Sequence, residues 1–148
     1  MEKVEVLQKS KLFENLMPDE IEMLSELSQM KDYKSGETVI QEGDVGNSLF
    51  VIVAGEVEVL KKGTDGISKS IASMKEPDFF GEMSLIDKEL RSATIKVKSD
   101  TTLLILTSEN LHSFAKVFKN GFTMIVINIA RVLSNRLRDT NYKLSLKM

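Results

Sequence analysis

The sequence has no cysteine, no tryptophan and a single histidine, His112. Without cysteine the chain forms no disulfide and offers no thiolate, which excludes iron–sulfur ligation and thiol catalysis. One histidine also argues against a cupin-type metal enzyme, because such a site needs a cluster of histidine and carboxylate ligands. The sequence contains neither a P-loop nor a dinucleotide glycine fingerprint. We therefore expect no metal site, no cofactor and no catalytic activity.

Long apolar runs and a strong charge of one sign are missing as well. The most apolar run, residues 122–133, is interrupted by Arg131 and is too short to span a bilayer. The N-terminal residues alternate charged and apolar side chains and lack the continuous apolar segment of a signal peptide. The net charge of −2 provides no overall cationic field for nucleic acid or anionic lipid. We expect a cytoplasmic protein without membrane contact.

The spacing of the apolar residues changes along the chain. Ile21, Leu24 and Leu27 recur at helical spacing and predict a helix over residues 18–30, with Pro18 at its first position. Short runs rich in Val, Ile, Thr and Phe follow, separated by glycines and small polar residues. These runs predict strands at residues 37–41, 48–54, 56–62, 68–74, 93–98 and 101–106. Closely spaced strands with turn signals between them indicate an antiparallel sandwich or roll.

Helical spacing returns after the strands. We expect one helix near residues 109–118, capped by Thr107 or Ser108, and a long final helix that begins near Phe122, after Gly121. Apolar residues of the final segment repeat in a heptad pattern. The stripe consists of Val126, Ala130, Leu133, Leu137, Thr140 and Leu144. It fits two arrangements, a helix packed on the roll or a seam between two copies of the chain.

These segments describe one α+β domain over residues 1–148. An antiparallel β-roll, similar to a double-stranded jelly roll, would occupy residues 36–107. N-terminal helices would lie in residues 1–35 and C-terminal helices in residues 108–148. A length of 148 residues with 42% hydrophobic residues suffices for one substantial core.

Two charged residues, Glu82 and Arg91, stand beside runs that otherwise look buried. The pattern predicts a strand at Phe79 and Phe80, a turn at Gly81 and a short helix that starts near Met83. Free amides at a helix start, beside a glycine that allows close approach, form an anion site. Arg91 would add a guanidinium able to bind two phosphate oxygens.

Further donors follow directly, namely the Ser92 hydroxyl and the amides of Ser92 and Ala93. Glu82 does not suit the same anion, because like charges repel, but it suits a hydroxyl group beside the phosphate. A cyclic nucleotide meets all of these requirements, with one phosphate charge, one free sugar hydroxyl and an apolar base. The alternative is an internal salt bridge between Glu82 and Arg91 that ties the loop together.

Residues 80–97, FGEMSLIDKELRSATIKV, resemble the phosphate-binding cassette of the cyclic nucleotide-binding domain family. This family includes the bacterial catabolite activator protein and the regulatory subunits of cyclic-AMP-dependent kinase. The cassette pattern is matched by Phe80, Gly81, Glu82, Met83, Ser84, Leu85, Arg91, Ser92, Ala93 and Thr94. The turn glycines Gly36, Gly43 and Gly55 and the opening segment around residues 12–27 are also similar to the family.

The resemblance implies a role for each residue of the cassette, residues 79–94. Arg91 would pair with the cyclic phosphate and Glu82 with the ribose 2′-hydroxyl. The other expected contacts come from Gly81, Met83 and Ser84 at the turn, and from Ser92 and Ala93 at the phosphate. Leu90 departs from the family, which often has proline there.

The resemblance leaves the base open, since the hydroxyl of Ser92 suits either cAMP or cGMP; cAMP is our first expectation. Matching the final helix to the family brings Arg136 near the base. There its guanidinium would stack on a purine, or the side chain would lie in solvent.

The function that follows is a cyclic nucleotide sensor whose ligand moves the C-terminal helix. Two alternatives keep the fold. One is an interaction or dimerisation module with a degenerate pocket, and the other is the effector domain of a transcription regulator without its DNA-binding part. We expect cAMP or cGMP as ligand, a homodimer through the C-terminal helix and an unidentified downstream protein. We expect no DNA binding by this chain alone.

Overall fold

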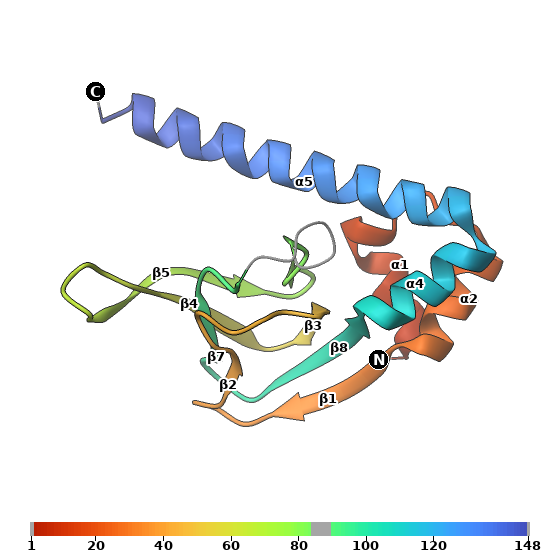
Figure 1. Ribbon diagram of the computed structural model, residues 1–148, viewed down its shortest axis with the longest axis horizontal. Coiled ribbons are helices and arrows are strands. Elements are labelled where there is room, and N and C mark those ends of the chain that lie inside the picture. The colour runs from red at the N-terminus through yellow and green to blue at the C-terminus, as the bar shows by residue number, and fades with distance from the viewer. Residues whose placement is uncertain (1, 84–89, 148) are drawn as a thin grey trace.

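The computed structural model describes residues 2–83 and 90–147, and it shows two four-stranded antiparallel sheets beside a group of helices (Figure 1). The N-terminal elements are α1 (Lys3–Lys9), the 3₁₀ helix η1 (Lys11–Phe13) and α2 (Pro18–Leu27). The strands are β1 (Gln29–Tyr33), β2 (Thr38–Ile40), β3 (Ser48–Ala54), β4 (Glu56–Lys62), β5 (Ser68–Lys75), β6 (Phe79–Phe80), β7 (Thr94–Val97) and β8 (Thr101–Thr107). Helices α4 (Ser108–Val117) and α5 (Lys119–Ser145) follow.

The sheet with strand order β1-β8-β3-β6 is covered on both faces. Alternate side chains of β3 point to opposite faces of the sheet. Leu49 and Val51 pack with the helices, and Phe50 and Ile52 pack against the second sheet. A strand buried on both faces reads as a continuous apolar run, and this explains the sequence SLFVIVA of β3. Two hydrophobic layers therefore share this sheet.

The second sheet has the order β2-β7-β4-β5 and completes the roll. Strand β4 pairs with β5 from Glu56 opposite Lys75 to Lys62 opposite Ser68, with one register shift. On its inner face, Val57 of β4 and Val97 of β7 are buried in the layer between the sheets. The α+β class and the antiparallel roll expected from the sequence are confirmed.

Two predicted boundaries are wrong. Helix α2 ends at Leu27 rather than Met30, because Gln29–Tyr33 pairs with β8 as strand β1. Helix α5 begins at Lys119, so Gly121 lies inside the helix rather than before it. A Cβ at Gly121 would lie 2.0 Å from the Glu20 Oε2 atom, which shows that this glycine allows α5 to approach α2. In both cases long-range packing overrides the local pattern.

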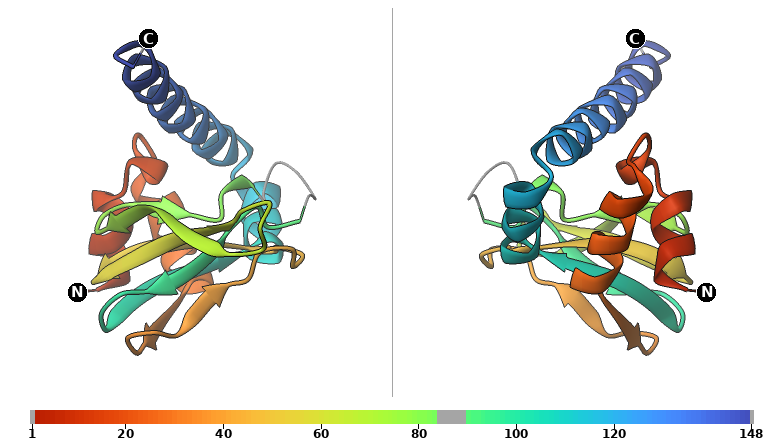
Figure 2. Two further views of the ribbon diagram at one scale, coloured as in Figure 1. Left: turned by 90° about the vertical axis from the view of Figure 1, so that its left-hand side faces the viewer. Right: turned by 90° about the vertical axis from the view of Figure 1, so that its right-hand side faces the viewer.

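The first half of α5 is anchored to the N-terminal segment. Its buried residues include Ile125, Asn128 and Ile129, and the Asn128 amide donates to the carbonyls of Leu12 at 3.0 Å and Glu14 at 2.9 Å. From residue 137 to residue 147 every side chain is exposed. Figure 2 shows this end of the helix rising away from the other helices. In the part of the chain that the structure describes, none of the helices could span a bilayer.

The heptad stripe of α5 does not form the face that packs on the core. Val126, Ala130, Leu137, Thr140 and Leu144 are exposed, whereas Leu133 is partly buried against the core. The first of the two arrangements left open by the sequence, a stripe packed on the roll, is therefore not observed apart from Leu133.

Candidate functional site

Arg91 is held in place by backbone groups from three segments. Its amide donates to the Asp44 carbonyl at 2.7 Å, and its carbonyl accepts the Gly43 amide at 2.9 Å. Its guanidinium donates to the Ser48 carbonyl at 3.0 Å and to the Gly81 carbonyl at 3.4 Å. These contacts fix both the main chain and the charged end of the side chain.

The guanidinium fits closely because two neighbouring positions are glycine. A Cβ at Gly46 would lie 2.2 Å from the Arg91 Nε atom, and a Cβ at Gly81 would lie 3.1 Å from Arg91 Nη1. Gly81 also has a φ of 82°, which favours glycine. The preceding Phe80 stacks on Phe50 with ring centroids 5.0 Å apart, so the turn starts from a rigid base.

The positive charge of Arg91 has no ion-pair partner among residues 2–83 and 90–147. Its partly buried position lowers the pKa of the guanidinium by desolvation, and the charge of Glu82 opposes that shift. The guanidinium stays protonated in any case. Within the described residues the guanidinium donates to the neutral carbonyls of Ser48 and Gly81. A fixed, partly desolvated cation with such partners is a favourable place for an anion.

Glu82 pairs with the final helix and not with Arg91. The side chain of Glu82 is only 9% exposed, and its Oε1 atom lies 3.3 Å from Arg136 Nη1. Arg136 also donates to the Phe79 carbonyl at 3.4 Å, and its guanidinium carbon lies 5.2 Å from the centre of the Phe79 ring. The alternative of an internal Glu82–Arg91 salt bridge is therefore wrong for this structure.

A cavity of about 330 Å³ connects these groups. This volume is within the roughly 300–1,000 Å³ range of small-molecule sites. Of the predicted site residues, the cavity is lined by Gly81, Glu82, Met83, Arg91, Ser92, Ala93 and Arg136. Ser84 lies outside the described residues. The structure thus brings seven of the eight predicted residues to one cavity.

The apolar wall of the cavity was not identified from the sequence. It is formed by Ile40, Val59, Met74, Phe80, Leu90 and Ile95. Phe80 and Leu90 belong to the motif, whereas the other four residues come from the strands of the second sheet. Alternation along EVEVL marks Val59 as one face of a strand, but only the pairing of β4 with β5 and β7 places it beside the cassette.

The described residues contain no group of three or more His, Asp or Glu side chains that would hold a metal ion. The polar groups that line the cavity are the guanidinium groups of Arg91 and Arg136, the Glu82 carboxylate, and backbone and hydroxyl groups. This set suits an anionic organic ligand with a hydroxyl group.

Comparison with known proteins defines the family. The cyclic nucleotide-binding domain profile matches residues 30–117. The chain is 30% identical over 137 residues to a cyclic AMP receptor protein of Thermus thermophilus, covering 93% of this chain and 62% of the relative. It is 27% identical over 135 residues to a cAMP-dependent protein kinase regulatory subunit of Aspergillus niger, covering 91% of this chain and 29% of that protein.

A solved cyclic nucleotide-binding domain from Methylobacillus flagellatus superimposes with a TM-score of 0.86 at 26% identity, covering 99% of this chain and 83% of that chain. The chain therefore belongs to the cyclic nucleotide-binding domain family. Its relatives are regulatory proteins and not enzymes. The chain spans about three fifths of the length of the Thermus relative, and a smaller share of the kinase subunit.

Proposed function

We propose that this chain is a sensor that binds a cyclic nucleotide, with cAMP as the first candidate and cGMP as the second, in the cavity between Arg91 and Glu82. The observation that carries the proposal is the fixed guanidinium of Arg91, which faces the cavity without an ion-pair partner in residues 2–83 and 90–147. A cyclic phosphodiester supplies one negative charge for this site. Cyclic AMP is part of the name of both the Thermus and the Aspergillus relative, and this favours the same ligand class.

Each part of the ligand has a counterpart in the cavity. The phosphate would accept hydrogen bonds from Arg91, the Ser92 hydroxyl and the Ala93 amide. The ribose 2′-hydroxyl would donate to Glu82, and Gly81 and Met83 would line the turn beside the sugar. The base would contact the apolar wall, and Arg136 would cover it from α5.

Isothermal titration of cAMP and cGMP into the wild type and Arg91→Ala tests the proposal. We expect saturable binding by the wild type and a loss of at least about 100-fold in Arg91→Ala, since charge-assisted contacts to a partly buried phosphate contribute about 3 kcal/mol. Arg138→Ala is the matched control, because it removes the same charge from an exposed position on α5. Wild-type protein that binds neither nucleotide would overturn the proposal, and the alternative of an interaction module with a degenerate pocket would replace it.

We further propose that Arg136 couples the ligand to α5. In this structure its guanidinium joins α5 to the roll through Glu82 and Phe79. A nucleotide bound to Glu82 on one side and to Arg136 on the other would add contacts that exist only when the helix is docked. Hydrogen exchange of the α5 amides near residue 136 should slow in the presence of saturating nucleotide. Exchange that is unchanged on binding would contradict the coupling.

We also propose a homodimer through the heptad stripe of α5. The apolar side chains Val126, Leu137 and Leu144 support it, because they lie on the helix at coiled-coil spacing and are exposed. Light scattering should give twice the chain mass, and Leu137→Asp should give the monomer mass. A wild-type chain that is monomeric at high concentration would refute the dimer.

We propose no sequence-specific DNA binding by these 148 residues. The basic residues Arg131, Arg138 and Lys143 are exposed on α5, but the chain as a whole carries a net charge of −2. A mobility shift on promoter DNA that requires the nucleotide would contradict this proposal.

A further inference from the structure

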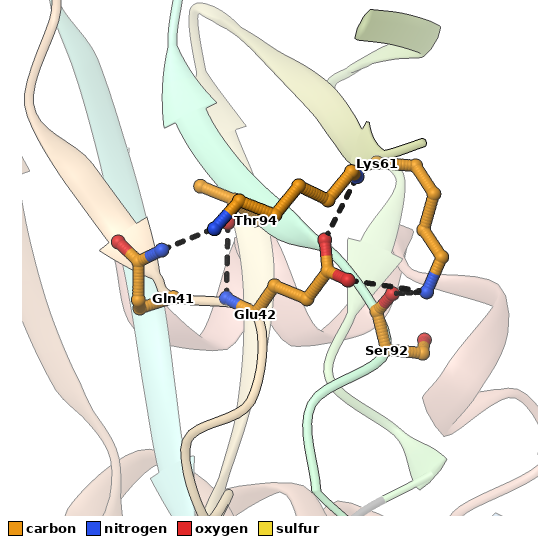
Figure 3. Close-up of polar contacts among 6 residues, drawn as sticks. Gln41, Glu42, Lys61, Ser92 and Thr94 are labelled. Carbon is orange, nitrogen blue, oxygen red and sulfur yellow. Dashed lines mark hydrogen bonds and ion pairs between the residues drawn. The ribbon is translucent and has the colours of Figure 1, made fainter. Parts of the chain in front are cut away.

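A second charged pair, formed by Glu42 and Lys61, lies next to the cassette, and no sequence motif marked these two residues. Glu42, in the loop after β2, accepts the Lys62 amide at 3.0 Å with its Oε1 atom. Its Oε2 atom lies 3.4 Å from the Lys61 ammonium. Figure 3 shows the Glu42 carboxylate between the end of β4 and the Lys61 side chain.

The Lys61 ammonium has a second partner in the cassette itself. Its Nζ atom donates to the Ser92 carbonyl, next to its ion pair with Glu42 (Figure 3). The long lysine side chain thus links the end of β4 to a residue directly after Arg91. The ammonium cannot leave this position without breaking both contacts.

The loop around Glu42 holds the residues on either side of Ser92. The Glu42 amide donates to the Thr94 hydroxyl at 2.9 Å, and the Gly43 amide donates to the Arg91 carbonyl at 2.9 Å. Residues 91, 92 and 94 are thereby fixed by the same loop and by Lys61. The Lys62 amide lowers the pKa of Glu42, burial opposes this effect, and Lys61 lowers the pKa further. The carboxylate is therefore ionised at neutral pH and keeps Lys61 in place.

The bond to the Ser92 carbonyl has a consequence for the cavity. In a trans peptide the carbonyl of one residue and the amide N–H of the next point in opposite directions. Fixing the Ser92 carbonyl toward Lys61 therefore fixes the Ala93 N–H away from Lys61. Both Ser92 and Ala93 line the cavity. The direction of a phosphate-binding donor is thus determined by a side chain that does not line the cavity.

We propose that Lys61, held by Glu42, is a positioning residue that aligns the Ser92–Ala93 peptide for the phosphate of the ligand. The inference rests on the proposed binding of a cyclic nucleotide in this cavity. Lys61 does not touch the ligand; it acts through the orientation of the peptide. Preorganised donors bind more tightly, because the ligand then bears no cost of ordering them.

The test is calorimetric titration of cAMP into Lys61→Met, with Lys62→Met as the matched control. Both variants remove one exposed lysine charge. Within the described residues the Lys61 ammonium contacts Glu42 and the Ser92 carbonyl, whereas Lys62 contacts Glu42 through its amide, which the substitution keeps, and its side chain acts on Glu42 only through its charge. We expect Lys61→Met to weaken binding about 5- to 10-fold, equivalent to the net contribution of one ordinary intramolecular hydrogen bond, and Lys62→Met to bind within about 2-fold of wild type. Lys61→Arg, which keeps a donor of similar reach, should restore most of the affinity.

The phosphorus NMR shift of bound cAMP at saturation separates positioning from general stability. It should move in Lys61→Met and stay at the wild-type value in Lys62→Met, with thermal midpoints of the nucleotide-free proteins close to wild type. Equal affinity and an equal phosphorus shift in both variants would refute the positioning role while leaving nucleotide binding intact. Failure of the wild type to bind the nucleotide would overturn both proposals. In that case the titrations of wild type and Arg91→Ala would be indistinguishable.

Discussion

Replacement of Arg136 by methionine should loosen the attachment of α5 to the roll. The Arg136 side chain extends from α5 to the cassette, with its Nη1 atom 3.3 Å from Glu82 Oε1 and its guanidinium carbon 5.2 Å from the centre of the Phe79 ring. Methionine keeps most of the apolar stem and removes the charge. The variant therefore isolates the ion pair and the ring contact from the packing of the helix.

The expected magnitude follows from the exposure of the two partners. Arg136 is 40% exposed and Glu82 is 9% exposed, so solvent screens one partner and the ion pair contributes about 0.5–1 kcal/mol. The contact with the Phe79 ring adds about 0.5–1 kcal/mol. A total near 1.5 kcal/mol lowers Tm by about 3–6 °C in a domain of this size.

Urea unfolding of the nucleotide-free protein measures this effect. A double-mutant cycle with Glu82→Gln separates the ion pair from the ring contact. Arg136→Met removes both interactions, whereas Glu82→Gln removes only the ion pair. We expect a coupling free energy of about 0.5–1 kcal/mol between the two positions. Arg138→Met, an exposed arginine on the same helix, should change stability by less than about 0.5 kcal/mol.

A coupling free energy below about 0.3 kcal/mol would refute the reasoning, because additive effects mean that Arg136 and Glu82 do not interact in solution. A stability loss in Arg138→Met equal to that in Arg136→Met would refute it in another way. The effect would then come from the charge or propensity of α5 and not from contact with the cassette.

Three other perturbations address the site and the core. Gly46→Ala places a Cβ 2.2 Å from Arg91 Nε, so nucleotide affinity should fall about 10-fold or more; calorimetry with unchanged affinity contradicts this. Asn128→Leu leaves two backbone carbonyls of the N-terminal segment without their buried donor, and urea unfolding should show a loss of about 2–4 kcal/mol; an unchanged midpoint argues against it. The folded-state pKa of Glu42 is lowered, so its contribution to stability is present above the unfolded pKa of about 4.3 and disappears as the pH falls through the folded value. The stability difference between wild type and Glu42→Gln should therefore be constant near neutral pH and shrink below about pH 4. An equal difference at neutral pH and below about pH 4 would refute a stabilising role of the Glu42 carboxylate.

The local sequence pattern was sufficient to predict most of the strands and the position of the cassette. The alternation in EVEVL and the apolar run SLFVIVA predict β4 and β3, because each reflects whether one or both faces of the strand are buried. Strand β1 was missed because its sequence, QMKDY, is mostly polar and exposed, and it becomes a strand only by pairing with β8. The start of α5 was missed because Gly121 serves close packing against Glu20 and not the end of a turn.

The family, the roll and the chemical types at the site follow from the sequence alone, since the order of glycine, acid, arginine and small residues is a local property of the chain. The partners of each charged side chain depend on the tertiary fold. Glu82 pairs with Arg136, 54 positions later, and Arg91 keeps its charge free of ion pairs within the described residues. Lys61 reaches the Ser92 carbonyl from the neighbouring strand. Such pairings depend on distances set by sheet register and helix docking, and separation along the chain does not encode them.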